Sequence, residues 1–438
     1  MLTANAMMNN PYRLRFTKIL VCTGAEDVPP LAVERGLVIT RTARPRYHEQ
    51  VSGCIAVIMC LAVLCQLPGQ GTDAAASIAH YDLCNSTESS SAPSSLSFVR
   101  SDRSALLAVY LNDTAADGTD TAVVVATSCT LNMSIRFVLP GGGTNATSPS
   151  STSPFPPRSP PGGGDAAPMR MFITFINVTV VGNVTFVGGP GVMIVAHLSF
   201  TLIGCDVAGD RSTVEVMNLG VQHSSFIITE SKIATRTRAL FFSAADDPLM
   251  TMYPSAAHAM FENVSVTVAR TAVLLNTTDT ASPTAGNVAA VGILTFICLP
   301  NTVPLCARNV HVVVSDSVIN VTSLPTFAGW VTTASFLGNA ANSNVIVIGS
   351  RMMTQVAQRS TILSFRDSDF LSVIVLSSSF TFGVATGPFN MFQFLGPTNR
   401  TIITTLNMSI WSGVPGLSTT DQGYRVMFLF AGGCTTLR

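Results

Sequence analysis

The stretches VVVSDSVI (residues 312–319) and VIVLSSSF (residues 373–380) carry the pattern from which the fold can be inferred. The pattern reads apolar, any, apolar, any, any, Ser/Cys/Thr, any, apolar. Further copies begin at Phe200, Phe226, Val266 and Val345, and a weaker copy begins at Val178. An internal repeat of this kind indicates stacked structural units that bury a shared core.

The spacing of the copies suits short strands. Phe336, Phe365 and Phe394 recur 29 residues apart in a second apolar signature, and earlier copies of the first pattern lie 26, 40 and 46 residues apart. No stretch keeps a 3.6-residue apolar period for two turns, which excludes helical repeats. The runs are rich in Val, Ile, Phe and Thr, the residues that strands prefer.

A coil of three short strands with turns takes about 20 to 30 residues, and such coils stack into a solenoid. We therefore predict an all-β protein: a right-handed parallel β-helix of the pectin-lyase-like type, preceded by one hydrophobic N-terminal helix. Positions 1, 3 and 8 of each copy are expected to face inward, and the Ser, Cys or Thr at position 6 to fill a corner and bond the backbone. A β-sandwich or a propeller is the alternative, although a propeller blade takes about 40 residues.

An uncharged apolar stretch, VSGCIAVIMCLAVLCQL, begins at Val51 and ends at Leu67. It is close to the lower length limit of a spanning helix, exceeds a typical signal core, and follows a basic N-terminal region. We interpret it as a signal sequence or as a signal anchor that attaches the chain to a membrane. A buried core helix is the alternative. Both membrane-targeting interpretations predict a secreted or cell-surface, membrane-associated protein.

The composition predicts five segments. Residues 1–50 form a basic extension without fixed structure, or an upstream extension that is not translated, and residues 51–67 form the targeting segment. Residues 71–139 form an irregular β portion or a cap of the β-helix. Residues 140–168 are rich in Pro, Gly, Ser and Thr and bury too little apolar surface to fold, which predicts a linker or insertion. Residues 169–438 hold the β-helix repeats.

Acceptor sequences for N-glycosylation, Asn-x-Ser/Thr, occur only after the apolar stretch, which agrees with export. The acceptor asparagines are Asn85, Asn112, Asn132, Asn145, Asn177, Asn183, Asn263, Asn276, Asn320, Asn399 and Asn407. Six cysteines also follow the apolar stretch, where an oxidising compartment favours disulfides.

Cys298 and Cys306 are the one pair that we predict to form a disulfide, because a short loop with two prolines separates them. No set of Cys and His residues has the spacing of zinc ligands. We therefore expect neither a metal nor another cofactor.

Candidate catalytic residues are few. Parallel β-helices often carry polysaccharide lyases and hydrolases, which need carboxylates on adjacent rungs. Asp367 and Asp369 in FRDSDF are the strongest candidates, because residues two apart on a strand share a face. A polar turn between two apolar runs is the alternative, and only analogy of fold favours catalysis. His197, His223 and His311 lie beside or inside copies of the pattern, where they could stack along one edge or simply face solvent.

The phrases ARNVHVVVSDSVINV and SNVIVIGSRM are similar to the repeats of the dispersed gene family of kinetoplastid surface proteins. Those proteins are large, glycosylated and membrane-associated, with predicted parallel β-helix ectodomains. The resemblance extends over roughly residues 169–410 and implies the same fold and a surface location, but it brings no catalytic residues. This chain is much shorter and lacks the family's several C-terminal spans, so we expect any membrane attachment to come from residues 51–67.

The function expected from these features is recognition rather than chemistry. The formal net charge is zero and 11% of the residues are charged, so no overall field attracts nucleic acid. We predict a non-enzymatic surface or secreted glycoprotein for adhesion, recognition or coat structure, with a glycan or protein ligand on its outer face. A carbohydrate-active β-helix enzyme and a non-functional fragment of a repeated surface-protein family are the alternatives.

Overall fold

The computed structural model describes residues 16–22, 78–84, 96–101, 105–111, 121–139, 170–188, 194–209, 212–217, 219–244, 260–277, 290–298, 306–323, 330–357, 359–385, 389–412 and 425–430. Within these ranges the backbone forms strands and their turns, without a helix. The all-β prediction is confirmed.

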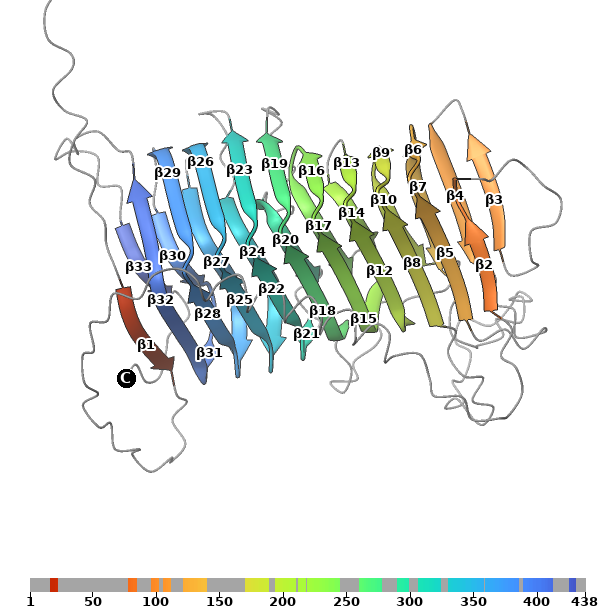
Figure 1. Ribbon diagram of the computed structural model, residues 1–438. Coiled ribbons are helices and arrows are strands. Elements are labelled where there is room, and N and C mark those ends of the chain that lie inside the picture. Colours follow the sequence, from red (N-terminus) through yellow and green to blue (C-terminus); the bar gives the residue numbers. More distant parts are fainter. Residues whose placement is uncertain are drawn as a thin grey trace, which may run out of the picture. The chain divides into compact units, whose positions relative to one another are not determined.

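The strands stack into three ladders of parallel neighbours, which run through the row of arrows in Figure 1. Ladder 1 contains β2 (Ile78–Asp82), β5 (Thr121–Thr127), β8 (Arg170–Ile176), β12 (Leu198–Ile203), β15 (Gly220–Thr229), β18 (Phe261–Ala269), β22 (His311–Ser315), β25 (Asn344–Ile348), β28 (Ser372–Leu376) and β32 (Thr401–Ser412). Ladder 2 contains β6 (Thr130–Leu131), β9 (Thr179–Val181), β13 (Asp206–Ala208), β16 (Lys232–Thr235), β19 (Ala272–Thr277), β23 (Val318–Ser323), β26 (Arg351–Ala357), β29 (Ser379–Ala385) and the end of β32. Ladder 3 contains β4 (Leu106–Leu111), β7 (Ser134–Leu139), β10 (Val184–Gly188), β14 (Ser212–Met217), β17 (Arg238–Ala244), β20 (Ala290–Cys298), β24 (Trp330–Ala341), β27 (Arg359–Asp369), β30 (Phe389–Phe394) and β33 (Arg425–Phe430).

One rung of the stack takes one strand from each ladder in a fixed order. For example, β17 of ladder 3 is followed by β18 of ladder 1, β19 of ladder 2 and then β20, which pairs with β17 one rung earlier. The short strands β11 (Ile194–Ala196), β21 (Ala307–Arg308) and β31 (Thr398–Asn399) lead into ladder 1. This long run of parallel pairs is consistent with a β-helix-like solenoid. The ladders also continue from β5 to β8, on either side of residues 140–168.

The eight-residue pattern faces the core as predicted. In the copy VVVSDSVI, Val312 and Val314 lie in ladder 1 and Ile319 lies in ladder 2, and each is at most 1% exposed. Parallel register puts each of them over its equivalent in the next rung, so the copies build continuous apolar columns. Burying one such aliphatic side chain contributes about 1.5–3 kcal/mol.

Phenylalanines form one of these columns in ladder 3. The rings of Phe336 and Phe365 stack with centroids 5.3 Å apart, and those of Phe365 and Phe394 with centroids 5.4 Å apart. Phe296 and Phe242 extend the column toward the N-terminus. The 29-residue spacing seen in the sequence is therefore the length of one rung.

Two columns of left-handed backbone turn the chain at the two ends of the ladder 1 strands. Corner A, at their N-terminal end, consists of His197, His223, Asn263, Asn309, Asn342, Phe370 and Arg400. Corner B, between ladders 1 and 2, consists of Ser128, Asn177, Gly204, Glu230, Arg270, Asp316, Gly349, Ser377 and Asn407. Their φ values lie between 47° and 63°, a region that Asn, Asp, His and Gly enter most easily.

The small residue at position 6 directly follows corner B and is buried. The backbone N–H of Ser317 donates to Oγ of Ser350 (3.3 Å), and that hydroxyl donates to the carbonyl of Ile348 (2.9 Å). The N–H of Ser350 donates in turn to Ser378 (3.2 Å). The same arrangement links Cys205 to Ser231. The prediction that position 6 fills a corner and bonds the backbone is confirmed, and we call this set the serine column.

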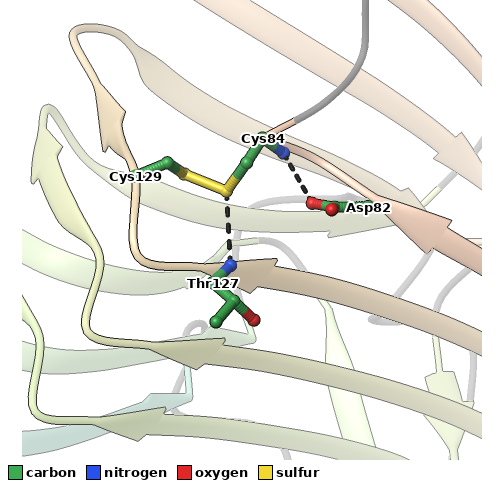
Figure 2. Close-up of a disulfide and its surroundings, with 4 residues drawn as sticks. All are labelled: Asp82, Cys84, Thr127 and Cys129. Carbon is green, nitrogen blue, oxygen red and sulfur yellow. Dashed lines mark hydrogen bonds between the residues drawn. A yellow bond between two sulfur atoms is a disulfide. The ribbon is translucent and has the colours of Figure 1, made fainter.

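A disulfide lies at the N-terminal end of the stack. Cys84, just after β2, is bonded to Cys129, which follows corner B in the next rung (Figure 2). The N–H of Cys84 donates to Asp82, and the N–H of Thr127 lies 3.3 Å from Sγ of Cys84. The sequence does not predict this pair, because 45 residues separate the two cysteines.

Two antiparallel pairs occur at the ends of the ladders in the described part of the chain. β3 (Leu96–Ser101) pairs with β4, and β1 (Phe16–Cys22) pairs with β32. β1 falls in the segment for which the sequence predicts an extension without fixed structure. Its run Ile-Leu-Val-Cys has strong strand preference, and β32 offers it an edge.

The predicted hydrophobic helix, residues 51–67, lies outside the described residues. Within the described ranges, the structure contains no helix that could span a membrane.

Candidate functional site: the outer row at corner A

Ladder 3 offers little surface to a ligand. Its outward positions Thr295, Ser335, Ser364 and Gln393 are at most 6% exposed, and Oγ of Ser335 donates to Oγ1 of Thr295 (3.1 Å). The positions that alternate with them point to the phenylalanine column, so both faces of ladder 3 are buried from β20 to β30. In the earlier rungs several of its outward side chains, such as Arg136 of β7, are exposed or half-buried. In the C-terminal rungs of the described stack, the surface open to a ligand is therefore that of ladder 1, ladder 2 and the corners.

Corner A carries a connected row of polar side chains across four rungs. The imidazole rings of His197 and His223 stack with centroids 5.4 Å apart and an interplanar angle of 15°. Nδ2 of Asn263 lies 3.2 Å from Nδ1 of His223, and Nδ2 of Asn309 donates to Oδ1 of Asn263 (3.0 Å). Successive rungs place each group about 4.7–4.9 Å from the next, so the row offers repeated hydrogen-bonding groups along one line.

The electrostatics of this row are close to neutral. Burial lowers the pKa of His197, and the neighbouring His223 and Arg170 lower it further. His197 therefore stays neutral at neutral pH. The amides of Asn263 and Asn309 carry no charge, so the central part of the row presents neutral hydrogen-bonding groups.

A second row runs beside corner A, one residue earlier in each rung. Arg308 and Glu262 form an ion pair across two rungs with an N–O distance of 2.6 Å. Further along, Nδ2 of Asn399 donates to Oδ1 of Asp369 (3.0 Å). Here the corner residues are Phe370, which is 45% exposed, and Arg400, whose guanidinium lies 4.5 Å from the centre of the phenyl ring. The C-terminal part of the surface thus combines an aromatic face with charge.

The two carboxylate candidates lie at the end of β27. Asp369 is half-buried beside corner A and is engaged by Asn399. Asp367 pairs with Asn339 in the parallel register, and the structure does not describe its side chain. Ser368 between them is buried. The pair therefore belongs to strand β27 rather than to a free turn, and Asp369 joins the surface of corner A.

The three histidines do not form one stack. His197 and His223 occupy corner A, whereas His311 lies two residues past the corner, exposed on ladder 1 in register with Ser265 and Asn344. Asparagine takes the corner position in its rung. The sequence offered one signal for this row: a His or an Asn shortly before or at the start of most copies of the pattern, residue types that are enriched where φ is positive.

Cysteines and metal ligands add little to this surface. Cys298 and Cys306 are bonded to each other, and both are buried. Cys205 is a free, buried thiol of the serine column, and burial raises its pKa. Among the described residues, no group of three or more His, Cys, Asp and Glu side chains is placed to hold a metal ion.

The acceptor asparagines differ in exposure. The exposed ones are Asn132, Asn177, Asn276 and Asn407, and the half-buried ones are Asn183, Asn263, Asn320 and Asn399. Asn85, Asn112 and Asn145 lie outside the described residues. The amide nitrogens of Asn263 and Asn399 make hydrogen bonds to neighbouring side chains at corner A, so both side chains are part of that surface.

Comparisons of the chain with protein-family models, with curated proteins and with solved structures found no match.

Proposed function

We propose that the chain is an exported glycoprotein of the cell surface or extracellular space whose corner A binds a glycan, in adhesion or recognition rather than catalysis. The observation that carries this proposal is the connected row His197–His223–Asn263–Asn309. Its neutral hydrogen-bond donors and acceptors repeat from strand to strand along one line. A glycan likewise presents hydroxyl and acetamido groups at regular intervals along its chain, and these can pair with such donors and acceptors. A protein ligand is the alternative occupant.

A right-handed, pectin-lyase-like β-helix is the form of solenoid that we propose for the stack. Three parallel ladders, inward apolar columns and corner turns support it. The repeat phrases that resemble those of kinetoplastid surface proteins imply the same location, and we propose membrane attachment through residues 51–67 if that segment is retained.

Binding to a panel of neutral glycans tests the function. We expect the purified full chain to bind at least one of them, and the double variant Asn263→Ala/Asn309→Ala to bind at least about tenfold more weakly, since two hydrogen-bonding side chains are lost. The matched control is Arg270→Ala at corner B, which removes an exposed ion pair with Glu230. Equal weakening in both variants, or no glycan binding by the wild type, would contradict the proposal.

A polysaccharide lyase or hydrolase is the second candidate, favoured by the position of Asp369 beside the same surface. Retaining and inverting enzymes both require a pair of carboxyl groups that flank the scissile bond. Product release from polysaccharides by the wild type, abolished in Asp367→Asn or Asp369→Asn, would establish this function. Turnover that both variants retain would remove these residues from the chemistry.

A further inference from the structure

An open hollow of about 560 Å³ lies on the outer face of ladder 2. Four outward residues are in register there on successive rungs: Val181, Ala208, Ala234 and Leu274. The two alanines stand between two larger aliphatic side chains. The small side chains of these alanines, with Gly182 and Gly209 in the lining, leave this face open, and its floor is aliphatic.

The rim of this hollow carries an acceptor asparagine. Asn276 lies two residues after Leu274 on β19, so both side chains share the outward face, and both line the hollow. Asn276 is exposed and begins the acceptor sequence Asn276-Thr277-Thr278. Arg236 also lines the hollow. It follows Thr235, which pairs with Leu275 of the next rung. Arg236 is therefore at the level of Asn276, one rung earlier.

We propose that Asn276 carries an N-linked glycan whose first N-acetylglucosamine units lie in this hollow. In the transfer, a bond forms between Nδ2 of Asn276 and C1 of the sugar. The bond from C1 to the diphosphate of the lipid-linked donor breaks, and the lipid diphosphate leaves with the electron pair while one amide proton is released. The proposal rests on the export proposed above, because the donor is met in the secretory compartment.

The chemistry of the hollow suits these sugars. The acetamido methyl group and the apolar face of the ring fit against Val181, Ala234 and Leu274. The guanidinium of Arg236 has five N–H donors, enough to serve the acetamido carbonyl and ring hydroxyls in addition to protein neighbours. Asn177 and Asn407 are exposed acceptors at corner B that do not line the hollow, so their glycans would project into solvent.

Site occupancy and native deglycosylation test this inference. The full chain is produced in a secretory host, its glycopeptides are mapped, and the folded protein is treated with an endoglycosidase that cuts between the first two N-acetylglucosamine units. We expect glycans at both Asn276 and Asn407, with the Asn276 glycan released several-fold more slowly from the native protein and equally fast after denaturation. Two variants should each speed its native release: Arg236→Ala, which removes the donor, and Ala234→Phe, which fills the hollow.

The outcomes separate the two proposals. Equal native release at Asn276 and Asn407, or occupancy of Asn407 with Asn276 unmodified, overturns the inference and leaves the proposed export intact. An absence of glycan at every acceptor, with the chain retained inside the cell, overturns the export and the inference that rests on it.

Discussion

Corner A and corner B share one backbone conformation and differ in the residue that comes directly after the turn. Both turn the chain through residues with positive φ on successive rungs, from β12 onward at corner A and from β5 onward at corner B. After corner B comes the serine column, whose buried hydroxyls accept an N–H from the preceding rung. After corner A only some rungs have this arrangement: Ser224 and Ser343 accept the N–H of the preceding rung, whereas apolar residues such as Val264 take the position elsewhere. The corner side chains themselves form the polar row.

This difference separates scaffold from surface. The backbone N–H of the residue after corner B is buried and needs a hydrogen-bond acceptor. In the central rungs this position is therefore restricted to small side chains that can accept a hydrogen bond. The side chains of corner A project outward, and they are free to vary in chemistry as long as the backbone turn is kept. Recognition is therefore expected at corner A, and the more consistent loss of stability at corner B, where the arrangement runs through successive central rungs.

The largest effect is expected for Ser350→Val in the serine column. The variant leaves the buried N–H of Ser317 without its acceptor and should lower the free energy of unfolding by about 1–3 kcal/mol. Urea denaturation followed by circular dichroism measures this loss. The control is Ser372→Val, a half-buried outward position of β28, which should change stability by about 0.5 kcal/mol or less. If both variants are equally stable, the column does not stabilise the fold.

A smaller effect is expected for Cys205→Ser. Its thiol lies 3.3 Å from the carbonyl oxygen of Phe175 in the previous rung. A serine hydroxyl can make the same bond, as Ser317 does to Val268 and Ser350 does to Val314. The unfolding free energy should fall by about 1.5 kcal/mol or less, whereas Cys205→Leu should cost more because the corner is closely filled. A larger loss for serine than for leucine would show that apolar filling, not hydrogen bonding, sets this position.

The smallest effect is a pH dependence at corner A. The folded protein lowers the pKa of His197, so the unfolded chain takes up a proton below about pH 6.5 before the folded one does. The stability contributed by neutral His197 is present above that pH and is lost as the pH falls through the lower folded-state pKa. His197→Asn, which tolerates positive φ, should reduce the loss of stability between about pH 7.5 and pH 5. An unchanged pH dependence in the variant would contradict this assignment.

The sequence was sufficient for the scaffold because each copy repeats the same burial requirement. Inward residues such as Val312 and Ile319 and the buried Ser317 follow from local alternation and from the need of a corner for a small group. The phenylalanine column likewise appears as a 29-residue spacing, since parallel rungs of equal length superpose equal positions.

The surface was less accessible to prediction. For His197, His223 and His311 the sequence left open whether they stack along one edge or face solvent, and only the first two stack. Asn263 and Asn309 stand out in the sequence only as parts of acceptor and repeat phrases. Rungs of unequal length, 40 and 46 residues in this region, hide the superposition of these positions. The disulfide between Cys84 and Cys129 is hidden for a related reason, because its partners meet only when two rungs stack.

Sequence alone thus established the all-β class, the inward faces and the chemistry of position 6, because these depend on interactions that recur within each rung. Tertiary structure alone established which outward side chains become neighbours. Contacts between rungs depend on which residues are paired in the ladders. Insertions of unequal length change the number of residues between paired positions, but they leave the pairing itself unchanged. The polar row of corner A and the hollow beside Asn276 exist only in that stacked register.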